Sequence, residues 1–330
     1  MMKKVFFAAC VLLIVMGFAA CSNKQVPVST VNLQLQNSVD SLLKQGMGEY
    51  GATEGMAIVV ETSTGNLRAM VGLKENNGKL VSNTTLFSKA RETFLFRSAS
   101  LLAALETGNV SLDDMFDTYA GIDVVGQDTI YDHNWRKGGY GELTLLQGLA
   151  YNSSIAIDKA VDVAYQDKDV FLQKLEQMGL EKDSTFKGSW PLYALGFHHI
   201  KPVNFVSFFN AIANGGKMVS LKSQDSSAIV VDSMIAEKKN IESMKKAFRF
   251  YVTNGLGKKA ESKMVNVAGT SGTIHTDDGI YADFCGYFPV EKPKYTVFVS
   301  YKRSEIPVSG GGMAGQTFRK IAEQIMKTCK

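Results

Sequence analysis

Residues 55–71 decide the fold: Gly55-Met56-Ala57-Ile58-Val59-Val60-Glu61 leads through Ser63-Thr64-Gly65-Asn66 into Leu67-Arg68-Ala69-Met70-Val71. Two short apolar runs, separated by a polar segment that contains glycine, are typical of two strands joined by a tight turn. This stretch therefore predicts a β-hairpin.

The segments on either side of the hairpin set the fold class. Before it, apolar residues at helical spacing predict a helix (Leu35, Val39, Leu42 and Leu43). Near the other end, the β-rich run from Lys294 to Tyr301 predicts a strand, and a second helical stripe follows it (Ala314, Phe318, Ile321, Ala322 and Ile325). Because both ends supply the sheet and the middle supplies mostly helices, the expected class is α/β or α+β with one helical lobe.

The amino-terminal residues have the pattern of an export signal. Lys3 and Lys4 precede an apolar run that ends in Phe18-Ala19-Ala20-Cys21. This ending resembles the cleavage site of bacterial lipoproteins, which implies a signal peptide over 1–20 and a lipid on Cys21. We expect a polar tether over 21–29, a domain over 30–330, and a location on the periplasmic side of the cell envelope. An uncleaved anchor or a plain signal peptide are the alternatives, and both also place the domain outside the cytoplasm.

Charge and cysteine content exclude several classes of protein. Loss of Lys3 and Lys4 with the signal lowers the formal charge from +4 to about +2, and no long basic run is present, so nucleic acid is not an expected partner. Of the four cysteines, Cys285 and Cys329 remain beside Cys10 in the signal and Cys21 at the lipid site. They are far apart in the sequence, and we expect free thiols.

Several short strings then occur in a recognisable order: Trp135 with Gly138-Gly139-Tyr140-Gly141, Leu149-Ala150, Ala213-Asn214-Gly215-Gly216, Val267-Ala268-Gly269, Phe284-Cys285-Gly286-Tyr287-Phe288-Pro289 and Gly310-Gly311-Gly312. Over about residues 30 to 327 the chain resembles the transpeptidase domain of penicillin-binding proteins, in the serine β-lactamase and transpeptidase-like superfamily. The resemblance implies a five-stranded, mainly antiparallel sheet with helices on both faces. It also implies an all-helical lobe beside the sheet and an active site between the two.

The family's first motif is altered in this sequence. The resemblance implies a serine that attacks a D-alanyl-D-alanine carbonyl and a lysine three residues later, one helical turn away. Aligning back from Ala104-Leu105-Glu106-Thr107-Gly108 places these positions at Phe94 and Arg97. A benzyl group cannot attack a carbonyl. Arginine, with a pKa above about 12, stays protonated and is a poor base. Covalent catalysis is therefore not expected at this position.

The second and third motifs are altered as well. The second, Ser-x-Asn in the family, stands here as Asn152-Ser153-Ser154, which retains the hydroxyl and the amide in exchanged places. The third, Lys-Thr-Gly in the family, stands as Thr270-Ser271-Gly272-Thr273 and lacks the lysine. The polar groups that remain are the expected ligand-binding residues: Arg97, Asn152, Ser154, Ser271 and Thr273.

Other residues have plainer interpretations. The Ser-x-x-Lys strings that begin at Ser41 and Ser243 lie outside the first-motif region, and we interpret both as chance matches. His198, His199, His275, Asp277 and Asp278 match no common ligand spacing, so neither a metal nor another cofactor is expected. Phe94, Phe96 and Trp135 could form an aromatic platform or simply fill space. A buried Arg97 should meet a carboxylate, either from the protein or from a ligand.

Three functional hypotheses follow. The first is a non-catalytic envelope protein of peptidoglycan metabolism that acts as a scaffold, regulator or peptide-binding module, with a stem peptide or cell-wall synthesis proteins as partners. The second is an active D,D-transpeptidase, D,D-carboxypeptidase or β-lactam-binding enzyme that uses Ser98, Ser153 or Ser154. The third is a structural envelope protein that does not use the cleft.

Overall fold

The computed structural model describes residues 29–328. The expected signal peptide, the lipid site at Cys21, Cys329 and nearly all of the expected tether lie outside the described residues. Ser29 forms an isolated β-bridge with Gln224, and the Thr30 hydroxyl donates a hydrogen bond of 2.9 Å to the carbonyl of Leu67. The beginning of the described chain is thus attached to the body of the domain.

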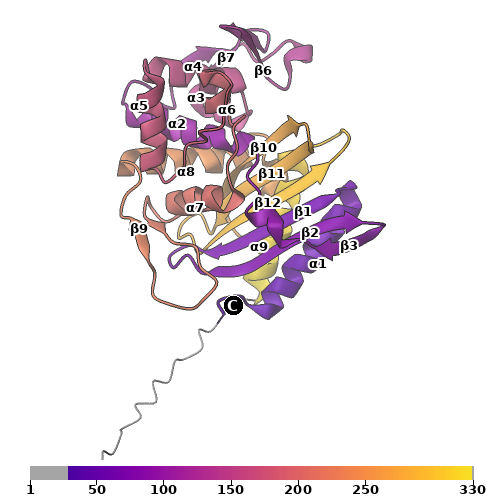
Figure 1. Cartoon of the computed structure of the whole chain (residues 1–330). Helices are drawn as coiled ribbons and strands as arrows, with labels where there is room; N and C mark the ends of the chain where they lie inside the picture. Colours follow the sequence, from indigo (N-terminus) through magenta and orange to yellow (C-terminus); the bar gives the residue numbers. More distant parts are fainter. Residues whose placement is uncertain (1–28, 329–330) are drawn as a thin grey trace, which may run out of the picture.

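A six-stranded antiparallel sheet forms the centre of the molecule (Figure 1). Its strand order is β10-β11-β12-β1-β2-β3. The strands are β1 (Glu54–Glu61), β2 (Leu67–Asn76), β3 (Lys79–Ser82), β10 (Ala268–Thr276), β11 (Gly279–Phe288) and β12 (Tyr295–Arg303). The predicted hairpin is β1 with β2, and the predicted carboxyl-terminal strand is β12.

The sheet differs from the expected five strands by the short edge strand β3. Asn77 and Gly78, which connect β2 to β3, have φ angles of 50° and 75°. Positive φ at both central residues is what a two-residue hairpin of type I′ requires, and Asn-Gly suits it best. The additional strand therefore follows from a local turn signal that the family resemblance does not contain.

Helices cover both faces of the sheet. On one face lie α1 (Leu33–Tyr50) and α9 (Gly315–Thr328), and on the other α2 (Arg97–Glu106), α7 (Pro202–Ala213) and α8 (Lys238–Thr253). The two-residue period of β1 divides its side chains between them: Ala57 and Val59 pack toward α1 and α9, whereas Ile58 packs toward the lobe. Both predicted helical stripes lie in these contacts, and all their members except the partly buried Leu42 are buried.

A mainly helical lobe stands beside the sheet. It contains α2, α3 (Leu145–Ala150), α4 (Ser154–Ala164), α5 (Lys168–Gln177) and α6 (Trp190–Leu195). The expectation of an all-helical lobe is corrected by two small antiparallel sheets of two strands each. In these, β4 (Met115–Asp117) pairs with β7 (Glu142–Thr144) and β5 (Ile122–Val125) pairs with β6 (Asp128–Tyr131). A third two-stranded sheet joins β8 (Met218–Val219) to β9 (Val230–Asp232).

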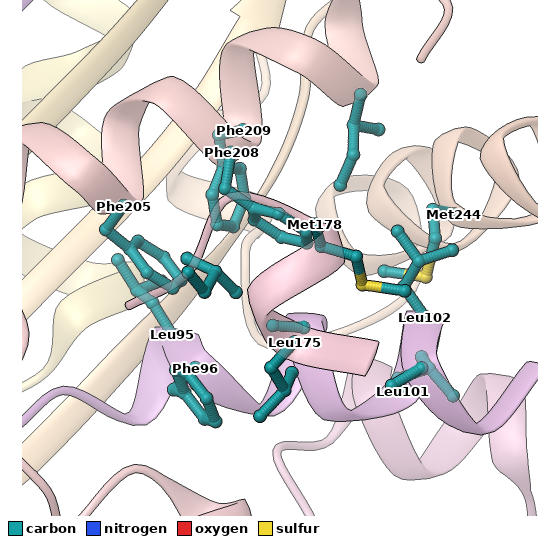
Figure 2. Close-up of a cluster of buried hydrophobic side chains, with 14 of the residues drawn as sticks. Leu95, Phe96, Leu101, Leu102, Leu175, Met178, Phe205, Phe208, Phe209 and Met244 are labelled. Carbon is teal, nitrogen blue, oxygen red and sulfur yellow. The ribbon is translucent and has the colours of Figure 1, made fainter. Parts of the chain in front are cut away.

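A buried hydrophobic cluster joins the lobe to the sheet (Figure 2). Phe205, Phe208 and Phe209 from α7 lie against one another, and the ring of Phe209 stacks on that of Phe248 with centroids 5.0 Å apart. Leu95 and other apolar side chains from the α2 region belong to the same cluster. This packing fixes the start of α2 relative to the sheet, and β10 is the sheet edge nearest to the lobe (Figure 1).

Candidate functional site between the lobe and the sheet

The segment that precedes α2 is held by a buried ion pair. Arg91 donates to both carboxylate oxygens of Asp283, at 2.8 and 2.7 Å, and its second terminal nitrogen also donates to the Ser300 hydroxyl at 3.0 Å. The Thr93 hydroxyl donates to Asp283 at 2.8 Å and caps the short helical turn η2 (Phe94–Phe96). These bonds anchor the first-motif segment to β11.

A glycine on β10 allows this segment to approach the sheet closely. A Cβ placed on Gly272 would lie 2.9 Å from the backbone nitrogen of Leu95 and 3.1 Å from the Cβ of Phe94. Real side chains do not tolerate such contacts. The glycine that the third motif retains therefore has a packing role, because it lets β10 and η2 form adjacent walls of one site.

Phe94 and Arg97 lie against each other at the base of α2. The guanidinium carbon of Arg97 lies 3.8 Å from the centroid of the Phe94 ring, which also packs edge-on against Phe197. Arg97 is 5% exposed, and its Nη1 donates to the carbonyl of Asn152 at 3.0 Å. Burial lowers the pKa of Arg97 to about 10, against the opposing influence of Asp132 and Tyr251, so the side chain is still a cation at neutral pH.

The second motif forms the turn between α3 and α4. Asn152 has a φ of 54°, and its side-chain amide donates to the Tyr251 hydroxyl at 3.2 Å. Ser153 is fully buried: it donates to Asp132 at 2.7 Å and accepts from the backbone nitrogen of Ala156, so it caps α4. The Ser154 hydroxyl donates to the carbonyl of Tyr131 at 3.2 Å.

The third motif lies on β10, where side chains alternate between faces. Ser271 and Thr273 project from the face opposite to Gly272, and both line the cleft. The hydroxyl of Ser271 makes a short hydrogen bond with that of Tyr251, and the Thr273 hydroxyl accepts from the backbone nitrogen of Gly310 at 2.9 Å. Thr270 is buried and, like Gly272, does not line the cleft.

The three motif regions meet in one cleft of about 1280 Å³, a volume that includes its open mouth. Its lining residues are Phe94, Arg97, Tyr131, Asp132, His133, Trp135, Asn152, Ser154, Leu256, Ser271, Thr273, His275, Val308, Ser309 and Gly311. All five expected ligand-binding residues are among them. Phe94 and Trp135 also share the cleft, whereas Phe96 packs on His198 in the lobe, so the three do not form one aromatic platform.

Two residues of the site were missed from the sequence. Tyr251, near the end of α8, links Asn152 to Ser271, and Asp132 holds the turn of the second motif. Asp132 lies three residues before Trp135, and this proximity is the one signal that could have drawn attention to it. Nothing in the sequence around Tyr251 distinguishes it from an ordinary core aromatic.

Comparison with known proteins identifies the family. The sequence model described as the penicillin binding protein transpeptidase domain matches residues 55–326. The chain belongs to this family. Membership confirms the expected superfamily and fold and links the protein to the cell wall, and relatives of this family are envelope proteins.

Solved structures support the same fold for this transpeptidase domain. A peptidoglycan glycosyltransferase from Burkholderia ambifaria aligns over 92% of this chain and 98% of its own, with 19% identity and a TM-score of 0.78. The apo transpeptidase domain of Burkholderia pseudomallei penicillin-binding protein 3 aligns over 93% and 97%, with 18% identity and a TM-score of 0.78. The transpeptidase domain of the FtsI4 D,D-transpeptidase from Legionella pneumophila aligns over 92% and 100%, with 20% identity and a TM-score of 0.68.

The serines considered as substitute nucleophiles are poorly placed in this transpeptidase domain. Ser98 is 1% exposed and does not line the cleft, and Ser153 is committed to capping α4. Ser154 reaches the cleft but donates to a backbone carbonyl. Ser41 and Ser243 lie on α1 and α8, and neither lines the cleft.

The histidines lie in separate environments. His198 is buried and its ring stacks on Tyr193 with centroids 3.8 Å apart, whereas His199 is exposed and His275 lines the cleft. Within residues 29–328, no group of three or more His, Cys, Asp or Glu side chains is arranged to hold a metal ion. Cys285 is a buried free thiol. In the same residues, the helices are too short or too polar to cross a membrane.

His198 is expected to make the domain sensitive to acid. Burial lowers its pKa to about 4, below the value near 6.5 of an unfolded chain. As the pH falls from 6.5 to 4, His198 takes up a proton in the unfolded chain but stays neutral in the folded one. The free energy of unfolding therefore decreases, by on the order of 2 kcal/mol. Urea unfolding at pH 7 and pH 4.5 should show this loss reduced in His198→Gln. The loss of stability should be unchanged in His275→Gln. Equal losses in the two variants would show that His198 is not the source of the acid sensitivity.

Proposed function

We propose that this protein is a non-catalytic transpeptidase-domain protein that binds peptides in its cleft and acts as a scaffold or regulator of peptidoglycan metabolism. The observation that carries the proposal is the pair at the base of α2, where Phe94 and Arg97 line the cleft at the positions that the sequence motif assigns to the nucleophile and the base. The phenyl ring offers no nucleophilic atom, and Arg97 remains a cation that cannot accept a proton.

Features that favour ligand binding remain in the cleft. It keeps an open volume, hydroxyl groups on β10 and an apolar wall that includes Trp135, Leu256 and Val308. β10 is an edge strand of the central sheet, and an extended peptide can pair with such an edge through main-chain hydrogen bonds. Loss of the nucleophile with retention of this surface supports recognition without turnover.

The proposal includes anchorage to the periplasmic face of a membrane by a lipid on Cys21. Its support is the sequence from Lys3 to Cys21, which resembles a lipoprotein signal. Labelled palmitate incorporated by the unaltered protein, and not by Cys21→Ala, is the expected result. Equal incorporation by both would rule out this site.

A peptide that ends in D-alanyl-D-alanine tests recognition and chemistry together. Equilibrium dialysis should detect reversible binding to the purified protein, while an assay for free D-alanine should detect no release over hours. Release that disappears in Ser154→Ala would instead establish the enzyme hypothesis. If no peptide binds, and partners captured from the envelope are retained by variants that block the cleft, the structural hypothesis is correct.

A further inference from the structure

Arg97 is a buried cation for which the described part of the chain supplies no ion pair. It is 5% exposed, and no carboxylate in residues 29–328 lies within salt-bridge distance of it. Its bonding consists of one hydrogen bond from Nη1 to the carbonyl of Asn152 and contact with the face of Phe94, while its Nε–H is buried without an acceptor. The expected protein carboxylate partner is therefore missing from the described residues.

Asp132 is the nearby carboxylate, and its oxygens are already used. One accepts from the Ser153 hydroxyl at 2.7 Å and the other from the backbone nitrogen of Ile155 at 3.3 Å, so the group holds the turn into α4. The negative charge of Asp132 acts on Arg97 only through space, without a salt bridge. Among the cleft-lining residues that the structure describes, Asp132 is also the single acidic one.

Arg91 in the same protein shows how a structural arginine is satisfied. It is 8% exposed, nearly as buried as Arg97, yet it has both oxygens of Asp283, the Ser300 hydroxyl and the carbonyl of Glu92 as acceptors. A buried charge without such compensation is costly. The contrast indicates that the acceptor of Arg97 comes from outside the described residues.

The surroundings of Arg97 define that acceptor. The ring of Phe94 contacts the guanidinium of Arg97. The N–H groups at the edge of the guanidinium suit a planar acceptor such as a carboxylate. Apolar side chains of Trp135, Leu256 and Val308 line the same cleft and suit small aliphatic or aromatic groups next to the acceptor. A free carboxylate at the end of a short peptide combines both features.

We propose that Arg97 is the anchor for the free carboxylate of a peptide bound in the cleft, a binding role at the position where the family has its base. This inference rests on the proposed function, because it specifies the ligand of the same site. The carboxyl end of the bound peptide is then directed toward the base of α2, next to Phe94. Arg97 holds its carboxylate in place of the lysine that the third motif lacks.

The test compares two peptides that end in D-alanyl-D-alanine, one with a free carboxylate and one with a carboxamide. Titration of the purified full chain, followed by tryptophan fluorescence or by calorimetry, should show at least tenfold weaker binding of the amide. Arg97→Gln should bind both peptides equally weakly. Arg68→Gln removes the same charge from a partly exposed ion pair with Glu61, away from the cleft, and should keep the preference.

The outcomes separate this inference from the function on which it rests. If the unaltered protein binds acid and amide equally, Arg97 is not a carboxylate anchor, although a peptide-binding cleft survives. If it binds neither peptide, both proposals fail. The acid and amide comparison is made on the unaltered protein, so it decides the question even if Arg97→Gln does not fold.

Discussion

Replacing Asp283 by alanine is expected to lower the free energy of unfolding by about 3–5 kcal/mol, because it leaves the Arg91 cation buried and without its counter-ion. The Asp283 side chain is 1% exposed and the Arg91 side chain 10% exposed. Thr93, which caps η2, would lose its acceptor in the same change. Urea denaturation followed by circular dichroism measures the loss.

A surface ion pair of the same protein is the matched control. Lys44 and Asp40 lie one turn apart on α1 at 2.7 Å, with side chains 46% and 32% exposed. Solvent screens such a pair, so Asp40→Ala should cost no more than about 0.5 kcal/mol. If Asp283→Ala cost as little as Asp40→Ala, the buried pair would not be what fixes the first-motif segment on the sheet.

The fold was predictable because its signals are local and periodic. The apolar runs of residues 55–71 became β1 and β2, and the helical stripes became the buried faces of α1 and α9. The order of short glycine-containing strings indicated the family. The sixth strand was also predictable in principle, since Asn77-Gly78 is a strong hairpin signal that the family expectation overrode.

The interactions inside the site were not predictable from the sequence. Arg91 and Asp283 are 192 positions apart, and Asn152 and Tyr251 are 99 apart, so only the folded chain brings them together. The residues of the three motif regions were found by their spacing from recognisable strings. Their bonding was not, because whether Ser153 is a cap or Ser154 reaches the cleft depends on the turn between α3 and α4.

Complete absence of covalent β-lactam labelling is the second large effect that we expect. Acylation requires a hydroxyl that can attack the lactam carbonyl and a group that can accept its proton. The ring of Phe94 and the cation of Arg97 supply neither. The serine and threonine hydroxyls of the cleft are all hydrogen-bonded: Ser154 donates to a carbonyl, Ser271 bonds with Tyr251, and Thr273 and Ser309 accept from backbone nitrogens. Among the described residues, no lysine lines the cleft beside them.

The most direct measurement is therefore labelling of the purified protein with fluorescent penicillin, beside a catalytically competent penicillin-binding protein as the positive control. We expect no fluorescent band after denaturing electrophoresis and an unchanged intact mass, while the control protein is labelled. Stoichiometric labelling that unlabelled penicillin blocks would show instead that the cleft holds a working nucleophile. Its loss in Ser154→Ala or Ser271→Ala would then identify the nucleophile.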